Sequence, residues 1–182
     1  MEEGWTQQVE KLELAALDAA HGRPKRLTIA LPQGRPYMLM TRMLDAPRAL
    51  VWECMVRPEH FANWWGPRSY TNEITAFDPR PGGKWRVIQR DREGREFIFR
   101  GEFRELVAPE RLVWTFGMEN MFDGVDAVET YILEDAGGRT RYTAISRFPS
   151  VEARDGMAAT DMEWGANESL DRLEELAGRL GR

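Results

Sequence analysis

The sequence predicts an α+β fold in which a curved antiparallel sheet packs against one long C-terminal helix. From residue 70 onward, short segments of alternating apolar and polar residues are separated by turns rich in Gly, Pro and Asp, a pattern typical of an antiparallel meander. Residues 160–180 instead carry apolar residues at helical spacing. An antiparallel sheet of this size has one face to cover, and the long helix is the available cover.

The N-terminal region is expected to lie outside the main domain. Residues 5–20 have the spacing of an amphipathic helix, whereas residues 22–36 contain several Pro and Gly residues and read as a linker with a short extended segment near 27–31. We therefore expect a helical extension over 1–21, a linker over 22–36 and one domain over 37–182. The apolar stripe of the predicted extension consists of Trp5, Val9, Leu12, Ala16 and Ala20.

The extension also resembles the C-terminal helix, since residues 4–15 align with residues 165–176. Three interpretations remain open. The similarity is a coincidence between two amphipathic helices, or the relic of a preceding tandem domain, or the sign that the extension packs on the domain or on a partner subunit.

The main domain begins with a strand over 36–45, followed by helices over 45–56 and 58–65. Asp45 is placed to cap the first helix, and Gly66-Pro67 ends the second. A short helical segment over 149–156 precedes the long helix, where Thr160 and Glu163 fit a capping box. Together with the first strand, the meander gives about six to seven strands. Its predicted strands are 70–78, 84–90, 95–106, 111–118, 125–135 and 139–148.

Composition excludes several classes of protein. The net charge is −5 and the basic residues are scattered, so we expect no nucleic-acid partner. No apolar segment is long enough to span a membrane and no signal peptide is evident, so we expect a cytoplasmic protein without a membrane partner. The single cysteine, Cys54, excludes an internal disulfide framework.

Several motifs occur in the order found in one protein family: DAPRALVWE, RPEHFANWWGP, FDPRPGGKWR, VAPERLVWTF and FPSVEARDGM. Over residues 37–180 the chain resembles the family named for homology to the activator of the heat-shock-protein-90 ATPase. That family belongs to the START-like (SRPBCC) helix-grip superfamily, whose fold is that of the birch-pollen allergen. The resemblance implies a cavity between the sheet and the long helix, and it adds a role in the stress response as an expectation.

Strand alternation selects the side chains that would face such a cavity. Bulky rings in register across neighbouring strands either fill the interior completely or leave an apolar pocket, and both readings remain open. The adjacent pair Trp64-Trp65 would stand at the cavity mouth, with Trp65 as the anchor and Trp64 facing the ligand, unless both pack in the core. The predicted lining is Trp64, Trp65, Trp85, Phe97, Phe99, Trp114, Phe116, Tyr131 and Tyr142.

No catalytic constellation is apparent in the sequence. There are only two histidines, and no group of His, Cys and Asp has the spacing of metal ligands, so we expect neither a metal nor a cofactor. The leading expectation is a protein that binds a small apolar or aromatic molecule, with a homodimer as the assembly. The alternatives are a cyclase- or hydrolase-like enzyme using the same cavity and, with less support, a chaperone-associated interaction module. Whether the protein catalyses a reaction stays open.

Overall fold

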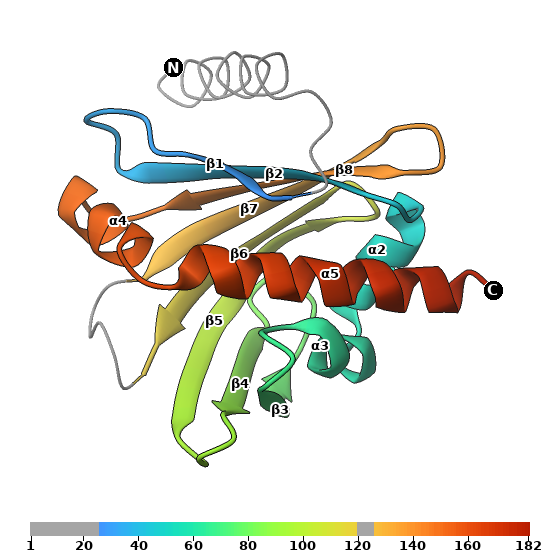
Figure 1. Ribbon diagram of the computed structural model, residues 1–182, viewed down its shortest axis with the longest axis horizontal. Helices are drawn as coiled ribbons and strands as arrows, with labels where there is room; N and C mark the ends of the chain where they lie inside the picture. The colour runs from blue at the N-terminus through green and yellow to red at the C-terminus, as the bar shows by residue number, and fades with distance from the viewer. Residues whose placement is uncertain (1–25, 120–125) are drawn as a thin grey trace.

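The computed structural model describes residues 26–119 and 126–182. The predicted helix over 1–21 lies outside the described residues. Figure 1 shows one curved sheet with the long helix α5 running across its inner face. The strands are β1 (Thr28–Ala30), β2 (Tyr37–Leu44), β3 (Thr71–Phe77), β4 (Lys84–Arg90), β5 (Glu96–Val107), β6 (Arg111–Met118), β7 (Ala127–Asp135) and β8 (Thr140–Arg147). The helices are α2 (Arg48–Val56), α3 (Pro58–Trp64), α4 (Val151–Ala158) and α5 (Met162–Leu180).

All neighbouring strands pair antiparallel, in the order β1-β2-β8-β7-β6-β5-β4-β3. The predicted α+β class and the helix-grip arrangement are confirmed. The described sheet has eight strands, one more than the upper expectation. The additional strand β1 lies in the segment expected to be a linker, where it pairs with β2 at the edge of the sheet.

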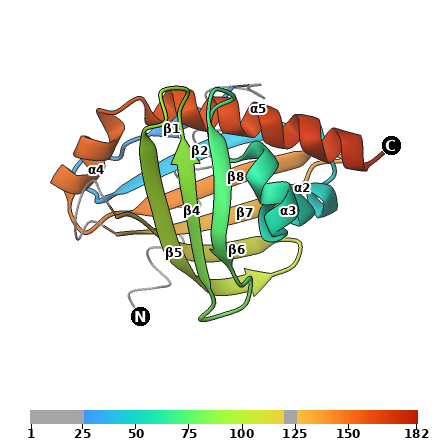
Figure 2. The same cartoon turned by 90° about the horizontal axis from the view of Figure 1, so that it is seen from below.

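The sheet curves strongly because its ladder shifts register at two places. Shifts occur between Ile74 and Ala76 on β3 and between Phe103 and Glu105 on β5, and such irregularities bend a strand and increase its twist. Strands β3, β4 and β5 therefore run at a steep angle to β7 and β8, as Figure 2 shows from below. The resulting half-barrel brings side chains from both ends of the sheet close to α5.

Helix α5 buries the stripe that its sequence predicts. Leu170, Leu173 and Ala177 are buried, whereas Leu180, the last predicted member, is 40% exposed because it lies in the final turn. The predicted capping box is wrong. Thr160 Oγ1 accepts a hydrogen bond from the backbone N–H of Met162 at 3.2 Å, but the N-cap residue is Asp161 and its side chain caps nothing. None of the described helices is both long and apolar enough to cross a lipid bilayer.

Helices α2 and α3 lie at one end of α5 (Figure 1). The N-cap of α2 is Pro47 and not Asp45, whose carboxylate pairs with Arg139 at 2.7 Å. Arg172 of α5 holds the end of α3, where its guanidinium donates to the carbonyl oxygens of Asn63 at 2.7 Å and Gly66 at 2.6 Å. These bonds satisfy carbonyls that a helix end leaves without an internal partner.

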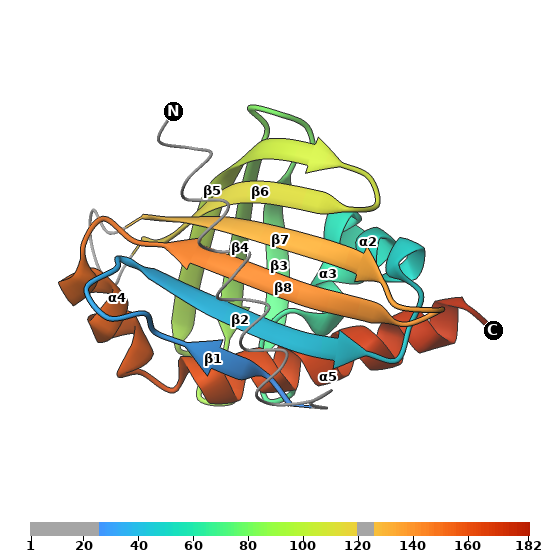
Figure 3. The same cartoon turned by 90° about the horizontal axis from the view of Figure 1, so that it is seen from above.

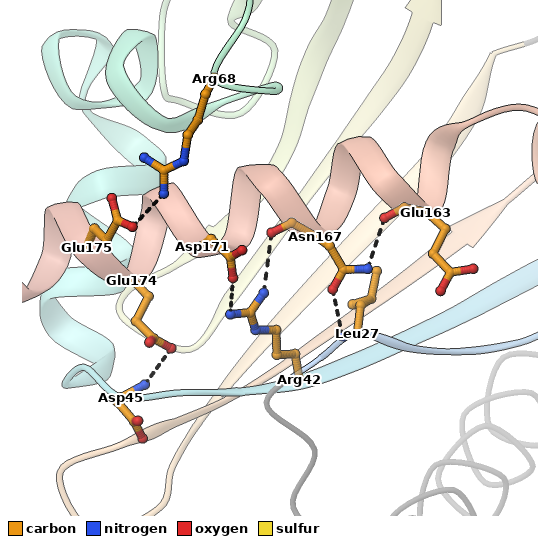
Figure 4. A network of polar contacts seen from close by, with 9 residues as sticks. All are labelled: Leu27, Arg42, Asp45, Arg68, Glu163, Asn167, Asp171, Glu174 and Glu175. Carbon is orange, nitrogen blue, oxygen red and sulfur yellow. Dashed lines mark hydrogen bonds and ion pairs between the residues drawn. The ribbon is translucent and has the colours of Figure 1, made fainter.

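A polar network joins α5 to the edge of the sheet (Figure 4). The guanidinium of Arg42 on β2 donates to the Asp171 carboxylate at 2.5 Å and to the backbone carbonyl of Asn167 at 3.3 Å. The Asn167 side chain accepts from the backbone N–H of Leu27, which immediately precedes β1, at 3.0 Å. One face of α5 is therefore fixed to both β1 and β2, and this fixes the depth of the interior beneath it.

Candidate ligand-binding interior

An aromatic cluster lies between the sheet and the helices. The Trp85 and Trp114 rings lie 4.8 Å apart between centroids, and Trp114 also contacts Phe61 at 5.9 Å and Phe103 at 5.7 Å. These four side chains are almost completely buried. Strand alternation thus correctly predicts the inward direction of Trp85 and Trp114.

The predicted lining residues do not all meet in this cluster. Phe99 and Phe116 pack against it and remain partly exposed, with their rings 5.7 Å apart. Phe97, two residues earlier on β5, instead contacts Tyr70 at 5.8 Å. Phe97 therefore lies away from the others and is the weakest of the predicted lining positions.

The anchoring role expected of Trp65 belongs to Trp64. Trp64 is the anchor, because its indole N–H donates to the Cys54 carbonyl at 2.7 Å and its side chain is buried. Trp65 is partly exposed, and its ring contacts Phe99 at 4.7 Å and Trp85 at 6.1 Å. The reason is the helix end: Trp64 is the last residue of α3, whereas Trp65 is its extended C-cap and points toward the sheet.

A carboxylate lies within this aromatic interior. The ladder places Trp114, Glu129 and Ser146 in one row across β6, β7 and β8. Glu129 Oε2 accepts from the Trp114 indole N–H at 2.9 Å and from the Tyr131 hydroxyl, and Oε1 accepts from Ser146 Oγ at 3.1 Å. Three donors from three strands therefore hold one partly buried carboxylate in place.

Glu129 was not among the predicted site residues. The sequence does contain a signal for Glu129: it has the same strand parity as Tyr131, which the alternation places on the inner face. A glutamate in a strand is ordinarily placed in solvent, and only the three donors explain why this one faces inward. We call Trp114, Glu129, Tyr131, Tyr142 and Ser146 the polar cluster.

The two tyrosines of the polar cluster are neutral hydrogen-bond donors. Burial raises the pKa of Tyr131 and Tyr142 well above their ordinary value, and the Glu129 carboxylate raises both further. Their rings lie 5.8 Å apart. The Tyr131 hydroxyl is used by Glu129, whereas the Tyr142 hydroxyl has no hydrogen-bond partner among residues 26–119 and 126–182. A hydroxyl donor and a carboxylate acceptor thus both belong to the polar cluster among the aromatic rings.

Part of the polar cluster lies toward one end of the interior. Glu129 and Ser146 lie toward the end of the sheet where β7 begins and β8 ends, close to α4 and the first turns of α5 (Figure 1). Apolar side chains from these helices, among them Met157 and Met162, pack against the core but stay partly exposed. This partly exposed apolar rim is the candidate mouth.

A hollow lies on the outer side of β4, β5 and β6. This surface groove has a volume of about 440 Å³ and is lined mainly by charged side chains. Its cations are matched by carboxylates: Arg86 pairs with Glu119 at 2.7 Å, and Arg100 pairs with Asp126 at 2.9 Å. The charged strand face expected from the sequence is thus present, and its internal pairing leaves little charge for a ligand.

A metal site is not evident in the described part of the chain, where no three His, Cys, Asp or Glu side chains gather closely enough to hold an ion. Cys54 is buried, and burial raises the pKa of its thiol to about 11. A thiol in this state is a packing group and not a nucleophile.

The fold and the interior together define a helix-grip protein of α+β class. Residues 45–178 match the family described as Activator of Hsp90 ATPase homolog 1-like protein. The chain belongs to this family, and the resemblance found in the motifs is confirmed. A comparison with curated proteins gives no match.

Solved structures of similar proteins share the fold. A Rhodobacter sphaeroides protein is 23% identical with a TM-score of 0.77, and the match covers 85% of this chain and 99% of that one. An Arthrobacter aurescens protein is 24% identical with a TM-score of 0.77, covering 84% and 91%. A Mycobacterium smegmatis protein is 20% identical with a TM-score of 0.75, covering 82% and 96%. At these identities the similarity establishes the architecture alone.

Proposed function

We propose that this protein binds a small, mainly aromatic molecule between the sheet and α5, with the polar cluster orienting the ligand. The observation that supports the proposal best is the Glu129 carboxylate, held by three donors within a cluster of aromatic rings. Binding sites for small molecules are mostly apolar and contain a few placed polar groups. The interior has this composition.

The polar cluster also restricts the chemistry of the ligand. An ionised carboxylate only accepts hydrogen bonds, and the hydroxyl of Tyr142 can donate one. A ring that carries a hydroxyl or an amine can donate to the acceptor position of Glu129 that its three protein donors leave open. An oxygen on the same molecule can accept from the hydroxyl of Tyr142. A carboxylate ligand, such as a fatty acid, would place like charges together in a medium of low dielectric constant.

Apolar contact supplies most of the affinity in this proposal. Burial of ring surface contributes about 25 cal/mol per Å², and stacking on rings such as Phe99 and Phe116 adds to it. The rim formed by partly exposed apolar side chains of α4 and α5, together with Phe99 of β5 and Phe116 of β6, provides the contact surface.

Tryptophan fluorescence tests the proposal, since Trp85 and Trp114 lie in the interior and report occupancy. The full chain is titrated with flavonoids, aromatic polyketides, sterols and fatty acids. We expect saturable quenching by the phenolic polycycles and little response to fatty acids. The absence of a response to every class contradicts a ligand site, and a preference for fatty acids contradicts the role of Glu129.

Two variants locate the bound molecule. Glu129→Gln removes the charge and Tyr142→Phe removes the unused hydroxyl, and each should weaken binding by about tenfold, equivalent to about 1.4 kcal/mol. Glu119→Gln is the matched control, because Glu119 pairs with Arg86 on the outer side of the sheet. Equal affinity of all three variants and the unsubstituted chain would place the ligand elsewhere.

An enzyme is the second candidate, and Glu129 is the observation that favours it, because catalysis in this cavity needs an inward-pointing ionisable group. We rank it lower because both carboxylate oxygens already accept hydrogen bonds from the protein. Conversion of a quenching ligand, lost in Glu129→Gln, would favour catalysis.

A chaperone-associated module ranks third. In the described part of the chain, the exposed large apolar side chains lie after β1, at the end of β5 and near the two opposite ends of α5, so they do not form one patch. They are Leu31, Val107, Trp164 and Leu180.

A further inference from the structure

The outer face of the sheet, opposite α5, carries a second apolar cluster. Leu39 is 0% exposed, and Tyr37 and Ile145 are each 4% exposed. Ala30 and Ile132 pack against these three side chains. We call these five residues the outer cluster. It spans β1, β2, β8 and β7, which are neighbours in the sheet.

No described helix covers the outer cluster. Figure 3 shows this face of β1, β2, β8 and β7 in front, while α5 lies behind the sheet and α2, α3 and α4 lie behind it or at its ends. Yet every residue of β2, on both faces, is buried. A strand buried on both sides is typical of a sheet covered on both faces. An occupant for this face is therefore to be sought outside residues 26–119 and 126–182.

The segment that precedes β1 has the composition of such a cover. Residues 5–20 carry an apolar stripe at helical spacing, and the chain enters β1 at Thr28, on the edge of the same face. A helix of this length measures about 24 Å, at 1.5 Å per residue. The eight-residue strand β2 measures about 26 Å. One helix therefore matches the outer cluster in length.

The charges on this face also favour residues 5–20 as its cover. Arg147 lies on β8 with the parity of Ile145, and its guanidinium is 5.5 Å from the centroid of the Tyr37 ring. Arg141 has the same parity and pairs with Glu134 on β7 at 3.7 Å. Burial lowers the pKa of Arg147. Residues 1–20 contain five acidic side chains and one basic side chain: Glu2, Glu3, Glu10, Glu13 and Asp18 against Lys11.

We propose that residues 5–20 form an amphipathic helix whose apolar stripe packs on the outer cluster of the same chain. A second copy of the chain could offer the same stripe, but the intramolecular segment is tethered by only seven residues, 21–27. A short tether gives an effective concentration on the order of millimolar, which is higher than the concentration of a free second copy. The extension is then a second layer of the domain and not a separate arm.

Paramagnetic broadening in the full chain tests this contact. A nitroxide is attached at Gln7→Cys, because on an ideal helix position 7 lies opposite the stripe. Cys54 is buried, and the unsubstituted chain treated with the same reagent is the control for labelling there. We expect the amide signals of residues 28–30, 37–44 and 140–147 to broaden, and those of α3 and β3 to stay sharp. No broadening over the outer face would overturn the proposal.

A mixed sample identifies the chain that supplies the helix. Isotope-labelled chain without the nitroxide is mixed with nitroxide-bearing chain at natural isotope abundance. We expect no broadening in this mixture. Broadening of the outer face here would show that a second copy is the occupant, which also overturns the proposal.

Two variants with the same chemistry test the stripe. Leu12 lies on it, whereas Leu14 is about 200° away on an ideal helix. In the nitroxide-labelled chain, Leu12→Asp should abolish the broadening over the outer face, and Leu14→Asp should preserve it. Equal behaviour of the two variants would contradict the contact. Because the outer cluster and the polar cluster lie on opposite faces of the sheet, this result is independent of ligand binding.

Discussion

The indole N–H of Trp114 on β6 donates to the carboxylate of Glu129 on β7 at a distance of 2.9 Å. This bond joins the centre of the aromatic cluster to the only carboxylate among the five residues of the polar cluster. A buried polar group without a hydrogen-bond partner destabilises the fold. The donors around Glu129 offset this cost and also fix the orientation of its carboxylate. A ligand that enters the interior meets an acceptor already in place.

The two interior tyrosines should respond differently to loss of their hydroxyl groups. Tyr131→Phe removes a donor to a carboxylate, and we expect the free energy of unfolding to fall by about 1.5–3 kcal/mol. Tyr142→Phe removes a hydroxyl without a described partner, and we expect a change below about 0.5 kcal/mol. Urea denaturation of both variants measures the difference. An equal loss in both would show that the Tyr142 hydroxyl is also bonded in the free protein.

Two ion pairs of α5, those of Asp171 and Glu175, should contribute differently to the free energy of unfolding. Arg42 is 5% exposed and pairs with Asp171, which is 49% exposed, whereas Arg68 and Glu175 are both 50% exposed. Asp171→Ala leaves a buried guanidinium without its carboxylate and should cost about 2 kcal/mol, reduced by the exposure of Asp171. Glu175→Ala should cost less than about 1 kcal/mol.

Thermal or chemical denaturation checks this comparison, and added salt provides a second reading. The pair of Arg68 and Glu175 should weaken more with salt, because exposed charges are screened. A larger effect of Glu175→Ala than of Asp171→Ala would contradict the account of the buried arginine.

Gly101 is the position on β5 where a side chain has no room. A Cβ there would lie 1.8 Å from the Thr115 carbonyl oxygen and 2.4 Å from the Trp85 indole nitrogen, which donates to that same carbonyl at 3.2 Å. Gly101→Ala should therefore lower stability by about 2–3 kcal/mol and shift the tryptophan emission. Gly178→Ala on α5, where a Cβ meets nothing within 4 Å, should raise stability by about 0.5–1 kcal/mol. Equal effects would exclude crowding as the cause.

Stability should decline at alkaline pH. Burial raises the pKa of the Cys54 thiol from 9.0 to about 11 and raises the pKa values of Tyr131 and Tyr142 well above the ordinary value. The unfolded chain therefore loses these protons at lower pH than the folded chain does. Unfolding then releases protons, and the stability that is fully present below about pH 9 is lost as the pH rises.

Denaturant midpoints measured from pH 8 to pH 11 test this expectation. Each group that is protonated only in the folded state contributes up to about 1.4 kcal/mol per pH unit. Tyr142→Phe should make the decline shallower. An unchanged slope in that variant would mean that Tyr142 does not titrate differently in the two states.

The local pattern of the sequence determined the elements and their inner faces. Alternation alone is sufficient to point Trp85, Trp114 and Tyr131 toward the helix, because successive side chains of a strand must lie on opposite faces. Helical spacing determined the stripe of α5 at Leu170 and Leu173. The order of the motifs determined the family, since each motif is tied to one turn or helix end of the fold.

Tertiary structure decided which polar groups belong to the interior. Glu129 is inward because donors from β6 and β8 meet it, and Arg42 is buried because Asp171 on α5 reaches it; both depend on partners distant in the chain. The orientation of Trp64 depends on the carbonyl of Cys54 in another helix. Periodicity states which face a residue occupies, whereas the cost of burying a charge or an N–H depends on partners that only the folded chain brings together.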